Sequence, residues 1–323
     1  MKKRIIFILL ILIFLFLFFF TFPPKRKIDW GVNFSQKHTT NLGLNWQETY
    51  LWLLENLNFK KVKIIVHWDL IEKEKEVYDF KDLDWQIKEA EKRNVSVILV
   101  IGQKTGRWPE CHIPKYLFLE GPSKRQEKLM NFLKVLVYRY KNSPAILAWQ
   151  VENEPFFPFG ECPVFDKEFF KKEIELVKKI DPERKVIVSD SGEGSFWIQA
   201  GLLGDIVGTT LYRKVYFKPL NIYLSYPFPP NFYFLKKKLI NFIFKKDVWL
   251  LELQAEPWCK NLLYNCDIEE QKITMDFERF KKIFNFVKKT GFDQIYFWGG
   301  EWWYWLKENY QDEKIPHFLR ENI

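Results

Sequence analysis

The sequence predicts a (β/α)₈ barrel preceded by an N-terminal transmembrane helix. An apolar run opens the chain, short apolar strands then alternate with amphipathic helices, and eight such strands recur about every 37 residues over 28–323. An open doubly wound sheet is the alternative, but it normally carries a glycine-rich phosphate turn after its first strand, and none follows here. We therefore expect two parts, an anchor with basic flanks at 1–27 and a barrel domain at 28–323.

The N-terminal run, residues 5–22, holds 18 consecutive uncharged residues, of which only Thr21 is polar. A helix of that length spans about 27 Å, close to the hydrocarbon thickness of a bilayer. No small-residue cleavage site follows, because the next residues are Pro23, Pro24 and a basic triplet. We expect an uncleaved signal anchor, with a cleaved secretory peptide as the alternative.

The net charge of +9 does not indicate a nucleic-acid partner. Six of the basic residues flank the apolar run, and the rest of the chain holds 44 basic and 41 acidic side chains. That balance is too small for a phosphate-binding footprint. All 14 Trp lie beyond residue 27, a density common in proteins that stack on flat, apolar ligand faces. We expect a monomer that binds no nucleic acid.

The expected strands are short runs rich in Val, Ile and aromatic residues, typical of strands buried on both faces. They cover 28–35, 62–68, 95–102, 146–153, 185–189, 205–212, 248–255 and 293–298.

The expected helices carry charges on one face and apolar residues at spacings of three and four. The clearest cover 83–93, 123–141, 166–180 and 269–290, and a further helix is expected at 232–246.

Two glutamates stand at the ends of expected strands. Asn153-Glu154-Pro155 closes the fourth strand, and Glu252 interrupts an apolar run in the seventh. Catalytic groups of such barrels lie at the carboxyl ends of the strands. A buried Glu is costly unless it is partnered or faces a polar site, so a buried ion pair with a barrel Lys or Arg is the structural alternative for each.

Two carboxyls that face each other across a pocket suit glycosidic hydrolysis. One donates a proton to the leaving oxygen while the other attacks, or assists water, at the sugar carbon. Each raises the proton affinity of the other, so one can remain protonated near neutral pH.

Over about residues 28–310 the sequence resembles the retaining glycoside hydrolases of clan A, the (β/α)₈ group that includes the family 5 cellulases and mannanases. The resemblance rests on Asn153-Glu154-Pro155, on Glu252, on Trp298 at the end of strand eight and on the stretch 68–80. It implies that Glu154 is the general acid/base and that Glu252 is the nucleophile of a retaining double displacement on a β-linked glycan.

The resemblance also implies three substrate-site roles. Asn153 would bind the sugar 2-hydroxyl, Tyr212 would orient the nucleophile, and Trp298 would form the floor of the subsite at the cleaved bond. Lys63 stands where many clan members have Arg, and strand six lacks the His that often precedes Tyr212 by two residues. Glu256 is a competing acid, which we expect in the loop beyond the strand.

His67 and Trp68 close the second strand, and Trp258 follows the seventh. We assign all three to substrate binding, with hydrophobic packing or a satisfied barrel-top position as the alternative. None of the four His stands in a metal-ligand spacing with another His or Cys. We therefore expect neither a metal nor a cofactor.

The four cysteines, Cys111, Cys162, Cys259 and Cys266, fall in loops after strands three, four and seven. An even count confined to loops at one barrel face indicates disulfides and an oxidising compartment. Pairing 111 with 162 and 259 with 266 is the most economical of the three possible arrangements. We expect a membrane-anchored enzyme with an extracytoplasmic barrel, or a secreted one. The rival interpretations are a non-catalytic carbohydrate-binding barrel and a membrane-tethered interaction protein.

Overall fold

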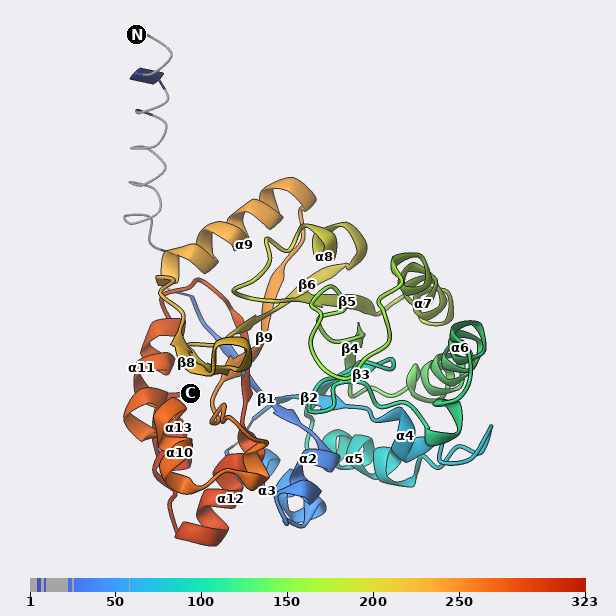
Figure 1. Ribbon diagram of the computed structural model, residues 1–323, viewed down its shortest axis with the longest axis horizontal. Coiled ribbons are helices and arrows are strands. Elements are labelled where there is room, and N and C mark those ends of the chain that lie inside the picture. Colours follow the sequence, from blue (N-terminus) through green and yellow to red (C-terminus); the bar gives the residue numbers. More distant parts are fainter. Residues whose placement is uncertain (1–4, 7–8, 10–22, 25, 58) are drawn as a thin grey trace.

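The computed structural model describes residues 5–6, 9, 23–24, 26–57 and 59–323, and its centre is a closed barrel of eight parallel strands (Figure 1). The strands follow the order β1-β10-β9-β6-β5-β4-β3-β2 around the barrel. Their bounds are β1 Asp29–Phe34, β2 Lys61–Ile65, β3 Ser96–Ile101, β4 Ile146–Val151, β5 Lys185–Asp190, β6 Ile206–Leu211, β9 Val248–Gln254 and β10 Gln294–Trp298. All eight expected strands are confirmed, and the (β/α)₈ prediction with them.

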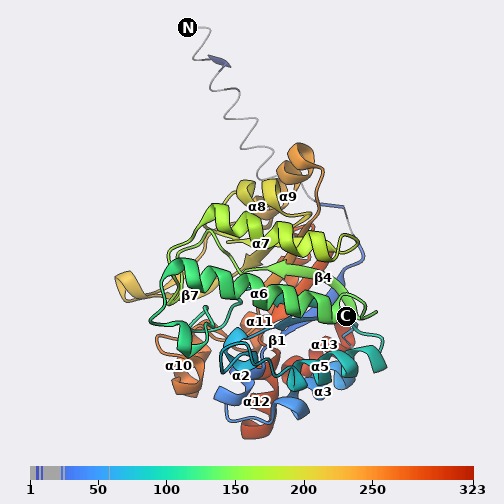
Figure 2. The same ribbon diagram turned by 90° about the vertical axis from the view of Figure 1, so that its right-hand side faces the viewer.

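Helices surround the barrel, and α6 and α7 lie along its outer surface side by side (Figures 1 and 2). The helix bounds are α2 Gln36–Asn41, α3 Trp46–Asn56, α4 Trp68–Ile71, α5 Lys81–Lys92, α6 Pro122–Tyr140, α7 Lys167–Ile180, α8 Ile198–Leu203, α9 Pro230–Phe244, α10 Ile268–Thr274, α11 Phe277–Val287, α12 Gly300–Tyr310 and α13 Lys314–Asn322. Short 3₁₀ turns cover Lys115–Leu117, Lys218–Leu220 and Leu263–Asn265.

Two apolar layers account for the barrel. Inside it, Ile98, Ala148, Ile187, Leu251 and Tyr296 form one buried cluster. Outside it, the apolar stripes of the helices pack on the outward strand residues in a larger cluster. The helices begin where the sequence supplies a cap; Asp166, for example, accepts hydrogen bonds from the first backbone amides of α7. Burial on both faces explains why the strands read as continuous apolar runs.

The prediction of one helix over 269–290 was wrong, because the segment breaks into α10 and α11. Met275 between them is extended and fully buried, so its side chain fills the core instead of continuing a helical face. Asp276 then starts a new helix by accepting a hydrogen bond from the amide of Arg279 at 2.7 Å. The sequence analysis also missed the antiparallel hairpin of β7 Lys214–Phe217 and β8 Ile222–Ser225, which lies outside the barrel.

The expected membrane anchor at 5–22 falls almost wholly outside the described residues. Among the residues that the structure does describe, no helix combines the length and the apolar character needed to cross a bilayer.

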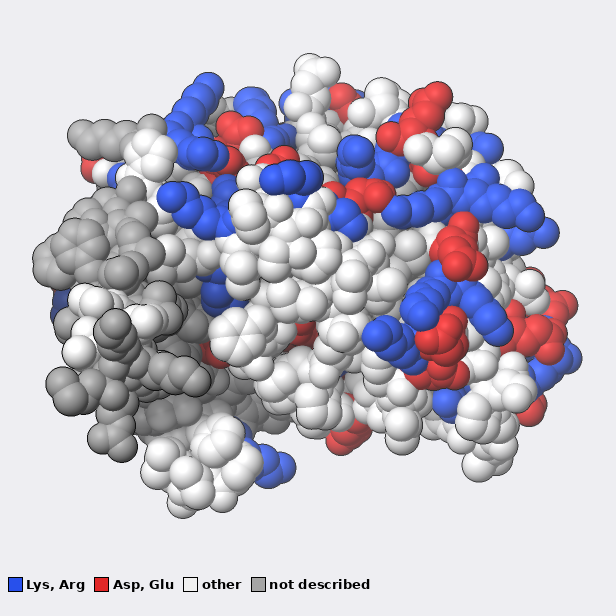
Figure 3. All heavy atoms as spheres, turned by 90° about the horizontal axis from the view of Figure 1, so that it is seen from above, with Lys and Arg blue, Asp and Glu red and all other residues white. Residues whose placement is uncertain are grey.

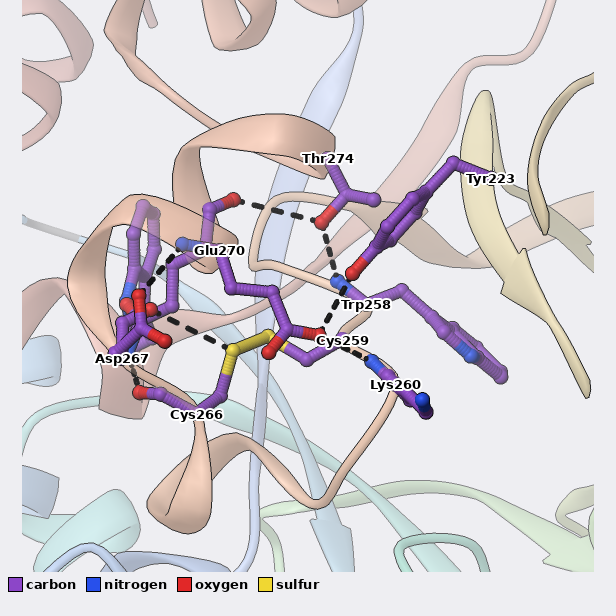
Figure 4. Close-up of a disulfide and its surroundings, with 10 residues drawn as sticks. Tyr223, Trp258, Cys259, Lys260, Cys266, Asp267, Glu270 and Thr274 are labelled. Carbon is purple, nitrogen blue, oxygen red and sulfur yellow. Dashed lines mark hydrogen bonds between the residues drawn. A yellow bond between two sulfur atoms is a disulfide. The ribbon is translucent and has the colours of Figure 1, made fainter. Parts of the chain in front are cut away.

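Both predicted disulfides are present, Cys111–Cys162 and Cys259–Cys266. The first joins the loop after β3 to the loop after β4, and the second closes a short loop after β9. Glu270 lies near the second pair of sulfurs (Figure 4), but those sulfurs are bonded to each other and are not free to bind a metal ion.

The two disulfides should stabilise the fold unequally. Cys111–Cys162 spans 51 residues and Cys259–Cys266 spans 7. Loop-closure entropy then assigns about 4 kcal/mol to the first and about 2 kcal/mol to the second. We expect Cys111→Ser/Cys162→Ser to lower the free energy of unfolding more than Cys259→Ser/Cys266→Ser in urea titrations. Non-reducing peptide mapping should recover both linkages, and four freely alkylated thiols would contradict the pairing.

Candidate active site

The candidate residues gather at the carboxyl end of the barrel, where β4, β6, β9 and β10 end. Strand β9 has a bulge of one extra residue relative to both neighbouring strands. On the β6 side the extra residue is Leu251, because Leu250 pairs with Thr209 and Glu252 pairs with Thr210. Such a bulge shifts the side chains that follow it. Leu251 fills the barrel interior, and Glu252 comes into register with the end of β6.

Glu252 is buried and has two partners from other strands. Its Oε1 lies 2.9 Å from Nζ of Lys63, which is itself fully buried on β2, and its Oε2 accepts a 2.9 Å hydrogen bond from the hydroxyl of Tyr212. Burial, together with the charges of Glu252 and Glu154, raises the pKa of Tyr212 well above its ordinary value, so the phenol remains a donor. Lys63 thus supplies a cation beside the predicted nucleophile, which the sequence analysis noted only as a departure.

Glu154 lies on the other side of β6 from Glu252. Its Oε1 accepts a 3.1 Å hydrogen bond from Oγ1 of Thr210, the residue that is in register with Glu252. Its backbone is left-handed, with φ 43°, a strained conformation for a residue with a side chain. Its amide donates to Oγ of Ser189 at 2.9 Å, which helps to hold that conformation. Burial and the charges of Glu252 and Glu110 raise the pKa of Glu154 well above its ordinary value.

The side-chain amide of Asn153 has one defined orientation. Nε2 of Gln150 donates to Oδ1 of Asn153 at 2.9 Å and to Ser189 at 3.1 Å. The Nδ2 donor therefore points the other way, toward Gly106, where an added Cβ would lie 3.3 Å from it. Asn153 thus turns the donor end of its side chain toward the loop after β3.

Trp298 ends β10 and is 7% exposed. The guanidinium of Arg107 lies 4.1 Å from its ring centroid, so one ring face is covered by a cation from the loop after β3. The same Arg107 pairs with Glu256 and, at 2.9 Å, with Glu301. Although burial alone would raise it, Arg107 and His38 hold the pKa of Glu256 at about 2. Glu256 lies beyond β9, as expected, and is engaged in this ion pair.

Trp68 is not in the candidate site, and its assignment to substrate binding was wrong. Its ring is fully buried, stacks on Phe132 of α6 at 5.5 Å and donates to Glu72 at 2.6 Å. The expected strand reached Trp68, but β2 ends at Ile65 and Trp68 instead begins α4. Its ring therefore packs between α6 and the barrel. His67 is also buried; it contacts Oγ of Ser35 at 3.2 Å and packs against His112.

Trp258 lies where expected. Its ring meets Tyr212 edge to face at 5.1 Å and Phe159 at 5.8 Å, and Phe159 in turn contacts Trp108, which is 41% exposed. A row of aromatic rings thus leads from the phenol beside Glu252 to the surface. Such rings can stack on the apolar faces of sugars.

The loop that carries Trp258 is tied to α10 and to the hairpin (Figure 4). The amide of Trp258 donates to Oγ1 of Thr274 at 2.9 Å, and Oε1 of Glu270 accepts from Tyr223 at 2.6 Å and from the Lys260 amide at 2.8 Å. Together with the Cys259–Cys266 disulfide, these contacts fix the position of the Trp258 ring.

The loops after β3 and β4 are joined at their base. Glu152, left-handed with φ 55°, accepts hydrogen bonds from the amides of Gln103 at 2.9 Å and Lys104 at 2.5 Å. Nζ of Lys104 donates to the carbonyls of Glu154 at 3.0 Å and Phe157 at 2.6 Å. Lys104 and Glu152 therefore hold the backbone of Glu154 in place. No sequence motif had indicated this role.

Glu110 is a further buried acid at this end of the barrel, and it was not expected from the sequence. It is 8% exposed, and its side chain packs against Gly160 of the neighbouring loop. None of the described side chains donates a hydrogen bond to its carboxyl oxygens. Burial and the charge of Glu252 raise the pKa of Glu110 to about 7. The sequence did offer one indication that Glu110 lies at the site, because Glu110 directly precedes Cys111. The Cys111–Cys162 disulfide holds this turn against the loop that follows Glu154.

No family model matches the chain. Several curated fungal proteins are similar to parts of it. One is a probable mannan endo-1,4-beta-mannosidase A of Aspergillus niger, 33% identical over 69 residues, which are 21% of this chain and 18% of that protein. Another is a probable mannan endo-1,4-beta-mannosidase F of Aspergillus flavus, 28% identical over 160 residues, which are 45% of this chain and 34% of that protein. The chain thus spans about a fifth to a third of the length of these relatives.

Among solved structures, the chain is similar to GH5_18 from Streptomyces cattleya, solved in complex with GlcNAc. The TM-score is 0.60 at 13% identity, covering 85% of this chain and 71% of that one. At that identity the likeness shows the barrel fold. Together with the fungal relatives, it supports the resemblance to a clan A glycoside hydrolase of the family 5 type.

Glu110 should make the free energy of unfolding depend on pH. The pKa of Glu110 rises from 4.5 to about 7 on folding, so the folded state binds the proton more tightly and stability falls as pH rises between those values. Glu110→Gln removes this penalty. We expect it to raise the free energy of unfolding at pH 8 by at most about 3 kcal/mol and to change it little at pH 5.

Urea titrations at the two pH values measure this difference. Glu161→Gln, at an exposed acid in the neighbouring loop, is the matched control and should show no such dependence. An equal effect of Glu110→Gln at both pH values would contradict the assignment.

Proposed function

We propose that the chain is a retaining glycoside hydrolase acting on β-linked glycans, with Glu154 as general acid/base and Glu252 as nucleophile. One observation carries this proposal. Thr210 of β6 donates to Glu154 and stands in register with Glu252, so the two acids flank the same strand end in different environments. Lys63 and Tyr212 bind the carboxylate of Glu252, while burial and the neighbouring acids raise the pKa of Glu154 well above its ordinary value, as suits a proton donor.

The chemistry follows from that difference. In the first step Glu252 attacks the anomeric carbon while Glu154 protonates the departing glycosidic oxygen, and a covalent glycosyl–enzyme forms. In the second step Glu154, now ionised, takes a proton from water, which attacks the same carbon and releases Glu252. Tyr212 holds the attacking carboxylate in one orientation throughout, and Asn153 donates to the 2-hydroxyl as charge develops on the sugar.

The substrate class is proposed from the relatives and from the aromatic row. The curated relatives are named as endo-acting β-1,4-mannosidases, which makes a β-1,4-linked mannan the first glycan to test. Trp298 would form the sugar platform at the cleaved bond, with Arg107 covering one face of its ring. Trp258, Phe159 and Trp108 would carry the neighbouring sugars.

We also propose that residues 1–27 anchor the barrel domain, 28–323, to a membrane, with the barrel on the extracytoplasmic side. The uncharged run over 5–22 supports the anchor. The two disulfides support an oxidising compartment.

Replacing the two acids should give different results. Glu252→Ala should abolish turnover of every substrate, because no covalent intermediate can form, and added azide should restore turnover of an activated aryl glycoside with inverted stereochemistry. Glu154→Gln should lower kcat on unactivated glycans by about 10²–10⁴-fold. It should largely spare the first step on substrates with good leaving groups, which pre-steady-state bursts detect. Glu161→Gln at the same end of the barrel should behave as the wild type.

A wild type that binds glycans but turns over none of a panel of mannan, glucan, xylan and aryl glycosides would favour a carbohydrate-binding barrel instead.

The anchor is tested separately. The full-length chain should stay with the membrane pellet after carbonate washing, because an apolar helix of this length is not released by charge disruption. A soluble mature form that begins near residue 25 would show that the segment is a cleaved secretory peptide.

A further inference from the structure

The described chain enters the barrel domain beside α9. Arg26 pairs with Asp293 at 3.1 Å, and Lys237 of α9 pairs with the same carboxylate at 3.2 Å. Pro23 lies against Gly291, since a Cβ added to that glycine would come within 2.9 Å of it. Pro23, the residue that follows the apolar run in the sequence, therefore lies at this side of the domain.

The last turns of α9, farther along the helix than the Phe234 ring that lies against Gly291, expose large apolar side chains. Phe242 is 75% exposed, Ile243 49% and Leu239 41%, and Leu202 of the neighbouring α8 is 57% exposed. The two helices pack together, because Gly201 of α8 lies against the ring of α9's Phe244. Figure 3 shows an uncharged area on this face, bordered by blue Lys and Arg side chains with red Asp and Glu side chains among them. We call Leu202, Leu239, Phe242 and Ile243 the α8–α9 patch.

Lysines adjoin the patch in the chain. Lys238 precedes Leu239 on α9, Lys245 follows the helix directly, and both are exposed. Two nearby acids are engaged, Asp293 by Arg26 and Lys237 and Asp205 by Lys178, whereas Asp247 beyond α9 is exposed. Basic residues at helix ends also suit the helix dipole, but the dipole gives no reason to expose Phe242 and Ile243. Apolar side chains next to a row of lysines suit the boundary between acyl chains and anionic headgroups.

We propose that the α8–α9 patch rests on the surface of the anionic bilayer that holds the N-terminal anchor, with Phe242 and Ile243 inserted among the lipids. The proposal rests on the anchor and not on the proposed catalysis. Residues 245–247 lead from α9 into the first residue of β9, so the patch lies at the amino end of the strands. The candidate active site lies at their carboxyl ends and therefore faces away from the membrane, toward polymeric glycan.

The test uses the full-length chain reconstituted into vesicles of phosphatidylglycerol and phosphatidylcholine with an alkyne-tagged lipid. A photo-cross-linking phenylalanine analogue replaces Phe242 in one protein. In the matched control it replaces Phe118, which is 67% exposed in the loop after β3. We expect several-fold more lipid adducts at position 242 than at 118, and fewer adducts at 242 in phosphatidylcholine alone or in a Lys238→Glu/Lys245→Glu background.

The outcomes separate the two claims. If the chain remains with carbonate-washed vesicles but labels equally at both positions, the docking face is overturned and the anchor stands. If the chain leaves the vesicles, the anchor and the docking face are overturned together. Glycan hydrolysis measured on the same samples reports on the proposed catalysis independently of both.

Discussion

A carboxylate enclosed in the barrel, Glu252, is the constraint on which the candidate site depends. A buried charge without partners costs several kcal/mol, so this position is stable only when other strands supply a cation and a donor. Lys63 comes from β2 and Tyr212 from the end of β6. Their separation in the chain means that the site exists only when the barrel is closed.

Strained backbone surrounds this arrangement. Glu152 and Glu154 are both left-handed, and β9 carries a bulge just before Glu252. Such conformations persist when their surroundings hold them in place. Here the amides of the loop after β3 bind Glu152, Lys104 binds the carbonyl of Glu154, and the Cys111–Cys162 disulfide joins the two loops.

Environment, and not residue type, separates the acids at this end of the barrel. Glu256 is paired with Arg107 and its pKa is lowered to about 2, whereas burial beside other acids raises the pKa of Glu154 well above its ordinary value. Glu252 has a third environment, between the ammonium of Lys63 and the hydroxyl of Tyr212.

The amino-acid pattern alone was enough to place the eight strands, because parallel strands covered on both faces must be apolar throughout. It was also enough to single out Glu154 and Glu252 as candidates, since acids at the ends of apolar strands need a special reason, and to pair cysteines that share one face. It was not enough for Lys63, Glu110 or the packing of Trp68, nor for the break at Met275. Those outcomes depend on which distant side chains meet once the barrel closes. A local sequence pattern does not specify such long-range contacts.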